Sequence, residues 1–267
     1  TGVMTGEGEK TFLELVHYYV DREGSLAEIP GIVYRDGEEI HNNGWRELTD
    51  LSEIPFVYEQ LKDFENKIIY YESSRGCPFS CSYCLSSIDK KLRFRDLELV
   101  RRELQFFLDH RVPQVKFVDR TFNCRHEHAM EIWRYILEHD NGVTNFHFEI
   151  SADLLRDEEI QLMSKMRPGL IQLEIGVQST NTDTIHAIHR HMDLVKLERS
   201  VAKIHSFGNI HQHLDLIAGL PYEDYDTFHR SFNDVYEMKP DQLQLGFLKV
   251  LKGSLMEQEA QKYGILH

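Results

Sequence analysis

The stretch Cys77-Pro78-Phe79-Ser80-Cys81-Ser82-Tyr83-Cys84 gathers three cysteines in one short loop. An apolar run at residues 68–71 and the pair Arg75-Gly76 precede it, so we expect a strand to lead into the loop. Iron–sulfur clusters are held by cysteine thiolates, and a four-iron cluster with three protein ligands keeps one iron open for another molecule. Structural zinc sites usually take four protein ligands, often as two C-x2-C pairs. The loop therefore indicates an iron–sulfur cluster, a zinc ion or three unligated thiols.

After the loop, apolar runs alternate with amphipathic stretches. The predicted strands cover residues 68–73, 115–119, 146–150, 171–177, 210–217 and 242–250. Helices are predicted between them, beginning near residues 97, 126, 157, 183, 196 and 226, with Asp96 as the N-cap of the first. Six β-α repeats imply a parallel sheet, since each parallel crossover needs a helix. We predict an α/β fold with a partial (β/α)6 TIM-like barrel over residues 67–267; a doubly wound sheet is the alternative.

Residues 1–66 have a different pattern. The spacing predicts a helix over residues 10–20, and residues 31–40 read as a β-hairpin with an Asp36-Gly37 turn. A polar, irregular segment around residues 54–56 follows and is interpreted as a linker. These residues are too few and too thinly apolar for an independent core. We therefore predict a short N-terminal helix-hairpin-linker extension.

Composition excludes some functions. The 267 residues contain 30 basic and 44 acidic side chains, a net charge of -14, which repels phosphate backbones. We expect no nucleic-acid partner. No run of about eighteen apolar residues occurs, so no membrane-spanning helix is expected. Three of the 4 cysteines lie close together, which suits metal binding in a reducing cytoplasm better than a disulfide framework. Cys124, the fourth, is interpreted as a small apolar residue.

Polar side chains recur toward the carboxyl ends of the predicted strands. They are Asp119 on the second strand, Glu149, Ser151 and Asp153 at the third, Glu174, Gly176 and Gln178 on the fourth, and His211, His213 and Asp215 on the fifth. Alternate positions on a strand share one face, and the carboxyl ends of barrel strands form active sites. For each residue alone, a structural ion pair is an equally good interpretation. The repeated placement favours an active site at the barrel mouth.

The spacing C-x3-C-x2-C, with aromatic Tyr83 before the last cysteine, resembles the signature of the radical S-adenosylmethionine (SAM) superfamily. The resemblance extends from about residue 67 to residue 253, through residues 115–123, 174–179, Arg190 and 215–221. The last three segments resemble the oxygen-independent coproporphyrinogen dehydrogenase and methylthiotransferase branch. The resemblance favours a cluster over zinc, for which His126 or His128 would be the fourth ligand.

The resemblance implies that Cys77, Cys81 and Cys84 bind a 4Fe–4S cluster whose open iron chelates the amino and carboxylate groups of SAM. It also implies that Asp119 contacts the amino group of SAM, Arg190 its carboxylate and Glu149 its methionine end. The implied contacts to the ribose come from Gln178 and Asp215, and those to the adenine from Phe79, Tyr83 and Ile217. Asp119 stands where family members have Gly-Gly-Glu, a departure from their pattern. An external donor such as flavodoxin or ferredoxin would reduce the cluster, and SAM would then be cleaved to start radical chemistry on a small-molecule substrate.

Residues 5–12, the following helix and hairpin, and Ile54-Pro55 resemble the join between a cobalamin-binding domain and a radical SAM core. The resemblance implies that residues 1–66 are the remnant and linker of an upstream cobalamin-binding domain. Its Asp-x-His-x-x-Gly loop is absent from this chain, so cobalamin would bind only through that domain. A Gly-rich turn before a capped helix is the simpler interpretation of residues 6–9. The functional alternatives are a zinc-binding structural or interaction domain, a methylthiotransferase and a porphyrinogen dehydrogenase.

Overall fold

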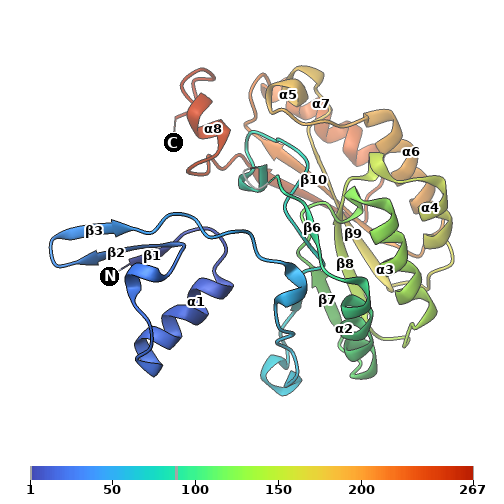
Figure 1. Ribbon diagram of the computed structural model, residues 1–267. Helices are drawn as coiled ribbons and strands as arrows, with labels where there is room; N and C mark the ends of the chain where they lie inside the picture. The colour runs from blue at the N-terminus through green and yellow to red at the C-terminus, as the bar shows by residue number, and fades with distance from the viewer. Residues whose placement is uncertain (1, 88–89, 267) are drawn as a thin grey trace. The chain divides into compact units, whose positions relative to one another are not determined.

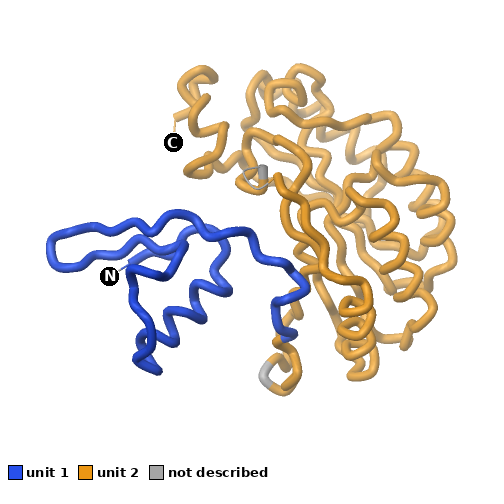
Figure 2. Tube along the Cα trace, viewed as in Figure 1, with its two compact units in different colours: residues 1–56 blue, residues 57–267 orange. Residues whose placement is uncertain are grey.

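The computed structural model of the protein describes residues 2–87 and 90–266. The chain forms two compact units, Thr1–Phe56 and Val57–His267 (Figure 2). Residues 57–66, which the sequence placed in the extension, cluster with the second unit. Tyr58 accounts for this, because its ring packs edge-on against Phe107 with centroids 5.6 Å apart. Its hydroxyl also donates a hydrogen bond to the carbonyl of Tyr70.

The first unit contains the predicted helix and hairpin. Helix α1 spans Glu9–Val16 and continues as a π-helical turn over His17–Asp21. Strands β2 (Ile32–Asp36) and β3 (Glu39–Asn42) pair antiparallel, and β1 (Gly2–Met4) adds a third strand beside β2. Gly37 lies in the hairpin turn with a φ of 58°, the left-handed conformation that such turns require.

The second unit is built on a six-stranded sheet. Its strands are β4 (Ile69–Tyr71), β7 (Gln114–Phe117), β8 (Asn145–Ile150), β9 (Ile171–Gln178), β10 (His211–Ala218) and β11 (Gln242–Phe247). They pair in parallel in the order β4-β7-β8-β9-β10-β11. A doubly wound sheet reverses its strand order at a switch point, and this sheet does not. The partial TIM-like barrel and all six predicted strands are therefore confirmed.

Helices follow the strands along one face of the sheet (Figure 1). They are α2 (Leu97–Asp109), α3 (His126–Glu138), α4 (Asp157–Met163), α5 (Thr182–Ala187), α6 (Leu194–His205) and α7 (Tyr225–Glu237). The short helix α8 (Leu255–Glu259) follows β11 and lies apart from this layer (Figure 1). The predicted cap of α2 is confirmed, since Asp96 accepts hydrogen bonds from the backbone N–H groups of Glu98 and Leu99. Within the described residues, no helix combines the length and apolar character needed to cross a bilayer.

Strand β9 shows how the fold creates a polar interior. Ile171, Leu173, Ile175 and Val177 are all fully buried, while the residues between them are only partly buried. Because side chains alternate across a strand, one face of β9 packs in the core and the other faces the interior of the barrel. Large apolar side chains fill the core, among them Phe117, Phe122, Trp133, Phe146 and Phe148. The inner face is left for polar residues.

Candidate active site

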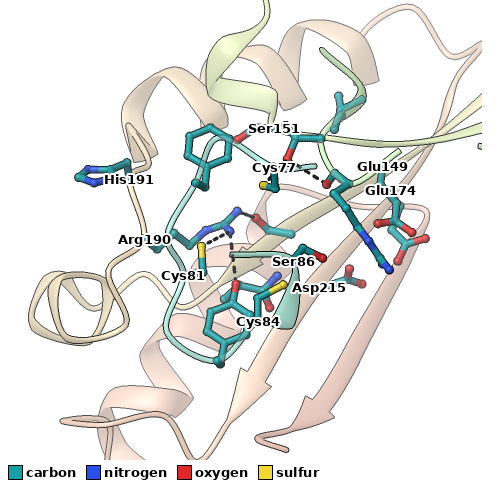
Figure 3. A pocket seen from close by; sticks show the side chains of 17 residues that line it. Cys77, Cys81, Cys84, Ser86, Glu149, Ser151, Glu174, Arg190, His191 and Asp215 are labelled. Carbon is teal, nitrogen blue, oxygen red and sulfur yellow. Dashed lines mark hydrogen bonds between the residues drawn. The ribbon is translucent and has the colours of Figure 1, made fainter. Parts of the chain in front are cut away.

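A cavity of about 200 Å³ lies at the carboxyl ends of the strands (Figure 3). It is lined by nine residues that the sequence singled out: Cys77, Phe79, Cys81, Tyr83, Cys84, Glu149, Gln178, Arg190 and Asp215. These residues come from the loop after β4, from three later strands and from the segment between α5 and α6. The fold thus brings together side chains that are more than a hundred residues apart in the chain.

The cysteine loop is closed at its base by a small ribbon. Strand β5 (Ser74–Arg75) pairs antiparallel with β6 (Arg93–Phe94), on the two sides of the cysteines. Gly76 lies next to this ribbon with a φ of 93°, and a Cβ there would approach the Lys91 carbonyl oxygen to 2.7 Å. Only glycine fits such a position without moving the backbone. The sequence did not predict the ribbon, because two-residue strands have no periodicity.

The three thiols of the loop line the same cavity (Figure 3). Cys77 and Cys81 are buried and Cys84 is partly buried. Burial raises the pKa of the Cys81 thiol, although the guanidinium of Arg190 acts in the opposite direction. Among the described residues, no three His, Cys, Asp or Glu side chains converge on a single-ion site. A four-iron cluster does not require such convergence, because each thiolate binds a separate iron, so this donor set suits a cluster.

Arg190 crosses the cavity beside the thiols. Its Nη1 lies 3.9 Å from Cys81 Sγ and 3.4 Å from the hydroxyl of Tyr83, and its Nη2 donates to the carbonyl of Gly176. The Nε of Arg190 is buried and has no hydrogen-bond partner in the described part of the chain. A buried guanidinium with a spare donor is suited to bind a carboxylate.

Gln178 ends strand β9 in an unusual conformation. Its φ is 73°, and the register between β9 and β10 shifts beside it, between Asp215 and Leu216. A positive φ is uncommon for a residue other than glycine, and such conformations cluster at functional sites. The side-chain amide folds back over Gly176, and its buried Oε1 lacks a hydrogen-bond partner among the described residues. Gln178 therefore offers an acceptor to the cavity.

A charged network forms the inner face of the barrel next to the cavity. Glu174 on β9 lies 3.0 Å from both Lys116 Nζ on β7 and His147 Nε2 on β8. These contacts, His147 first, lower the pKa of Glu174 to about 2. Glu149 is 3.8 Å from Lys116, and burial raises its pKa. The network holds Glu174 as a carboxylate at the edge of the cavity.

Asp215 on β10 has a different environment. Burial raises its pKa to about 7, and the neighbouring carboxylates Glu174 and Glu149 add to the shift. His213 Nε2 lies 3.1 Å from Asp215 Oδ1, and burial lowers the pKa of His213. Carboxyl groups with raised pKa values in a cavity are typical of ligand-binding sites.

Two of the predicted site residues do not line the cavity. Asp119 is completely buried and accepts hydrogen bonds from the backbone N–H of Ser73 and the hydroxyls of Ser73 and Ser74. It therefore braces the segment that leads to the cysteine loop. Burial raises the pKa of Asp119 to about 6.

The second of these residues, Ile217, packs with Tyr83 against an apolar cluster that contains Ile188.

Replacing Asp119 by asparagine is expected to change the pH dependence of stability. The pKa of Asp119 is above its ordinary value of 3.8, so the group contributes stability that is lost as the pH rises through about 6. The wild-type free energy of unfolding, relative to that of D119N, should fall by about 3 kcal/mol between low and neutral pH. Urea unfolding of the metal-free chain at several pH values measures this. Asp226→Asn, which removes an exposed carboxylate on α7, is the control, and equal pH profiles for wild type and D119N would contradict the prediction.

The histidines considered as zinc ligands have other partners. Both ring nitrogens of His126 face carboxylates, Glu158 at 2.6 Å and Glu159 at 3.0 Å. His128 Nε2 is 3.0 Å from the hydroxyl of Ser73. Neither histidine lines the cavity with the thiols. Cys124 is partly buried and also lies outside the cavity lining.

Several lining residues had no predicted role in the sequence. They are Ser86, Arg120, Thr121, Ile150 and His191, whereas Ser151, Glu174 and Gly176 were noted as polar or small residues near strand ends. Thr121 Oγ1 lies 3.9 Å from Cys77 Sγ. Arg120 and Thr121 follow a predicted strand end directly, and that position could have indicated them. Ser86 and His191 carry no such signal.

Comparisons with known proteins agree with this geometry. The sequence model of the Radical SAM superfamily matches residues 71–235. The cobalamin-dependent radical SAM methyltransferase TokK of Streptomyces tokunonensis is 24% identical over 251 residues, which cover 87% of this chain and 36% of TokK. The chain thus spans about a third of the length of this relative.

Two solved structures have a similar fold. The radical SAM methyltransferase TsrM from Kitasatospora setae, with cobalamin and a [4Fe-4S] cluster bound, gives a TM-score of 0.80 at 16% identity, over 97% of this chain and 56% of TsrM. The cobalamin-dependent radical enzyme OxsB, with aqua-cobalamin and SAM bound, gives 0.77 at 16% identity, over 99% of this chain and 46% of OxsB. The family match includes the cysteine loop and covers more than half of the 267 residues, and the chain therefore belongs to the radical SAM superfamily.

Proposed function

We propose that this chain is the catalytic core of an enzyme that binds a 4Fe–4S cluster and SAM and acts on a small-molecule substrate. The observation that carries the proposal is the single cavity lined by three thiols of one loop, the Arg190 guanidinium, the Gln178 amide and the Asp215 carboxyl. A cluster with an open iron and a zwitterionic ligand would use these groups together. The chemistry that a reduced cluster would supply here is the electron needed to cleave the carbon–sulfur bond of SAM.

The residues of the chain would position and shield the ligand. Cys77, Cys81 and Cys84 would hold the cluster, and Arg190 would pair with the SAM carboxylate through its two-pronged guanidinium. Gln178 and Asp215 would accept hydrogen bonds from the ribose hydroxyls. These groups are buried or partly buried, which would strengthen each polar contact with the ligand.

Asp119 and Ile217 would contribute indirectly. Asp119 would act by bracing the segment before the cysteine loop, because its oxygens are already bonded to Ser73 and Ser74. Ile217 would support the adenine end through Tyr83, with which it shares an apolar cluster. Glu149 lines the cavity and would face the methionine end of SAM.

We also propose that the full-length protein uses cobalamin for methyl transfer. Residues 57–267 make up 211 of the 267 residues, so matches over 97% and 99% of the chain take in most of residues 1–56 as well. This likeness to cobalamin-bound structures supports the assignment of residues 1–66 to the join with an upstream cobalamin-binding domain.

Anaerobic reconstitution with iron and sulfide tests the core of the proposal. We expect about four irons per chain and the broad visible absorbance of an iron–sulfur cluster. Adding SAM and a strong reductant should release methionine and 5′-deoxyadenosine, measured by liquid chromatography. A chain that takes up one zinc ion in preference to iron, and leaves SAM intact, would support the zinc-binding alternative and overturn the proposal.

Gly176→Ala is expected to weaken SAM binding without loss of stability. A methyl group at position 176 would lie 2.3 Å from Gln178 Nε2, the end of a flexible side chain, so the amide would turn away. Losing one or two hydrogen bonds should raise the dissociation constant of SAM about tenfold. Equilibrium dialysis with the reconstituted protein measures it. Gly246→Ala is the control, because a Cβ there meets its nearest atom at an ordinary 3.7 Å; equal losses in both variants would refute the role of Gln178.

A further inference from the structure

The middle of the cysteine loop is held by two distant segments. The backbone N–H of Ser82 donates to the carbonyl of Ile188 at 2.9 Å, and the carbonyl of Ser82 accepts from the N–H of Met256 at 2.8 Å. Ser82 lies between Cys81 and Cys84, and it is completely buried. Both peptide groups of this residue are therefore fixed from outside the loop.

Side-chain packing reinforces the contact with α8. Met256 is completely buried in a cluster with Ile188 and Leu220, and the ring of Tyr83 packs against that cluster. Ser254 caps α8 by accepting a hydrogen bond from Glu257 N. A capped end fixes the direction in which the first turn presents its N–H groups. Helix α8 thus meets the loop with one hydrogen bond and one buried side chain.

The contact also reaches the proposed SAM site. Arg190 follows Ile188 by two residues and touches both Cys81 and Tyr83. The segment that carries Arg190 and helix α8 therefore both hold the loop through backbone hydrogen bonds to Ser82. Helix α8 lies beyond residue 235, where the family match ends.

We propose that α8 is a clamp on the cysteine loop, with Met256 as a positioning residue that fixes the spacing of Cys81 and Cys84. The clamp determines how long the loop retains its metal centre. This inference rests on the proposed function, because it takes the loop as the site of a 4Fe–4S cluster. We therefore expect protein contacts to order the loop even in the chain without metal.

Met256→Ala tests the clamp against a matched variant. Met163 is also completely buried, so Met163→Ala removes the same side chain from α4, a helix of the layer that covers the sheet (Figure 1). In the metal-free chain, hydrogen–deuterium exchange of residues 77–84 should be at least about tenfold faster in M256A than in M163A. This measurement needs no cluster, so it tests the clamp even if the proposed function is wrong.

The reconstituted proteins provide the second measurement. Iron release to a chelator should be about tenfold faster from M256A than from wild type or M163A, with thermal melting recorded for all three. Equal exchange and equal iron release in M256A and M163A would overturn the clamp. Failure of wild type to take up iron would instead overturn the proposed function.

A proline pair tests the contact of α8 with the loop in a second way, by removing the N–H and the side chain of Met256 together. Met256→Pro removes the N–H that reaches Ser82, whereas Leu255→Pro places proline at the first position of α8, where it is tolerated. Ser254 has a ψ of 158°, which is compatible with a following proline. Faster exchange in M256P than in L255P supports the clamp, and the same exchange in both contradicts it.

Discussion

Replacing Cys81 by serine is expected to abolish cluster binding and SAM cleavage while the barrel stays folded. Cys81 is one of three thiols at the cavity, and its loss leaves two thiolates, fewer than a cluster with one open iron requires. Iron should fall from about four per chain to less than about one after anaerobic reconstitution. Deoxyadenosine formation should fall to the level without protein. The sheet does not pass through the loop, so the circular dichroism of the metal-free variant should match wild type.

Cys124→Ser provides the matched control for this prediction. Cys124 is partly buried and lies outside the cavity lining, so its replacement should change neither the iron content nor the cleavage rate. Cys77→Ser and Cys84→Ser should behave like C81S. Normal iron content in any variant of the three, or loss of iron in C124S, would remove the basis for the assigned ligand set.

Arg190→Lys is expected to weaken SAM binding about a hundredfold, although the positive charge is retained. Lysine cannot reproduce the planar fork that reaches Gly176 and Tyr83 while leaving a donor for a carboxylate. Charge-assisted hydrogen bonds contribute about 1.5–3 kcal/mol, which corresponds to a ten- to hundredfold change in affinity. Equilibrium dialysis of SAM against the reconstituted variant measures the effect, with iron content determined in parallel.

The control for R190K is Arg199→Lys. Arg199 is on α6 with 80% of its side chain exposed, and it lies outside the cavity lining. We expect R199K to bind SAM like wild type. A dissociation constant within about threefold of wild type for R190K, at normal iron content, would show that Arg190 does not bind the carboxylate.

The repeating units of the fold could be predicted from sequence, and the small elements between them could not. The six strands and the helices from α2 to α7 have hydrophobic periods long enough to recognise. The choice between a barrel and a doubly wound sheet depends on strand order, which is a property of long-range pairing. The β5–β6 ribbon and the role of α8 depend on contacts between residues that are far apart in sequence.

The residues of the candidate site also fall into those that strand patterns predict and those that depend on contacts between distant segments. Cys77, Glu149 and Asp215 could be placed at the mouth, because strand ends and alternation predict which side chains share a face. Asp119 was expected to face the ligand but lies buried against two serines. Asp119 follows Phe117, which is buried in the core, by two residues. That spacing could not be used to predict the burial of Asp119, because β7 ends at Phe117 and side chains beyond it no longer alternate between the two faces of the sheet.

The β5–β6 ribbon has a consequence for the maturation of the protein. In small zinc domains, metal binding itself provides the free energy that folds the chain. Here the ends of the loop are already paired through Ser74 and Phe94, and its middle is held by Ser82. Protein contacts, rather than iron, meet the entropic cost of closing the loop. If the proposed ligand set holds, we therefore expect the polypeptide to fold first and to receive iron and sulfide afterwards at the three thiols.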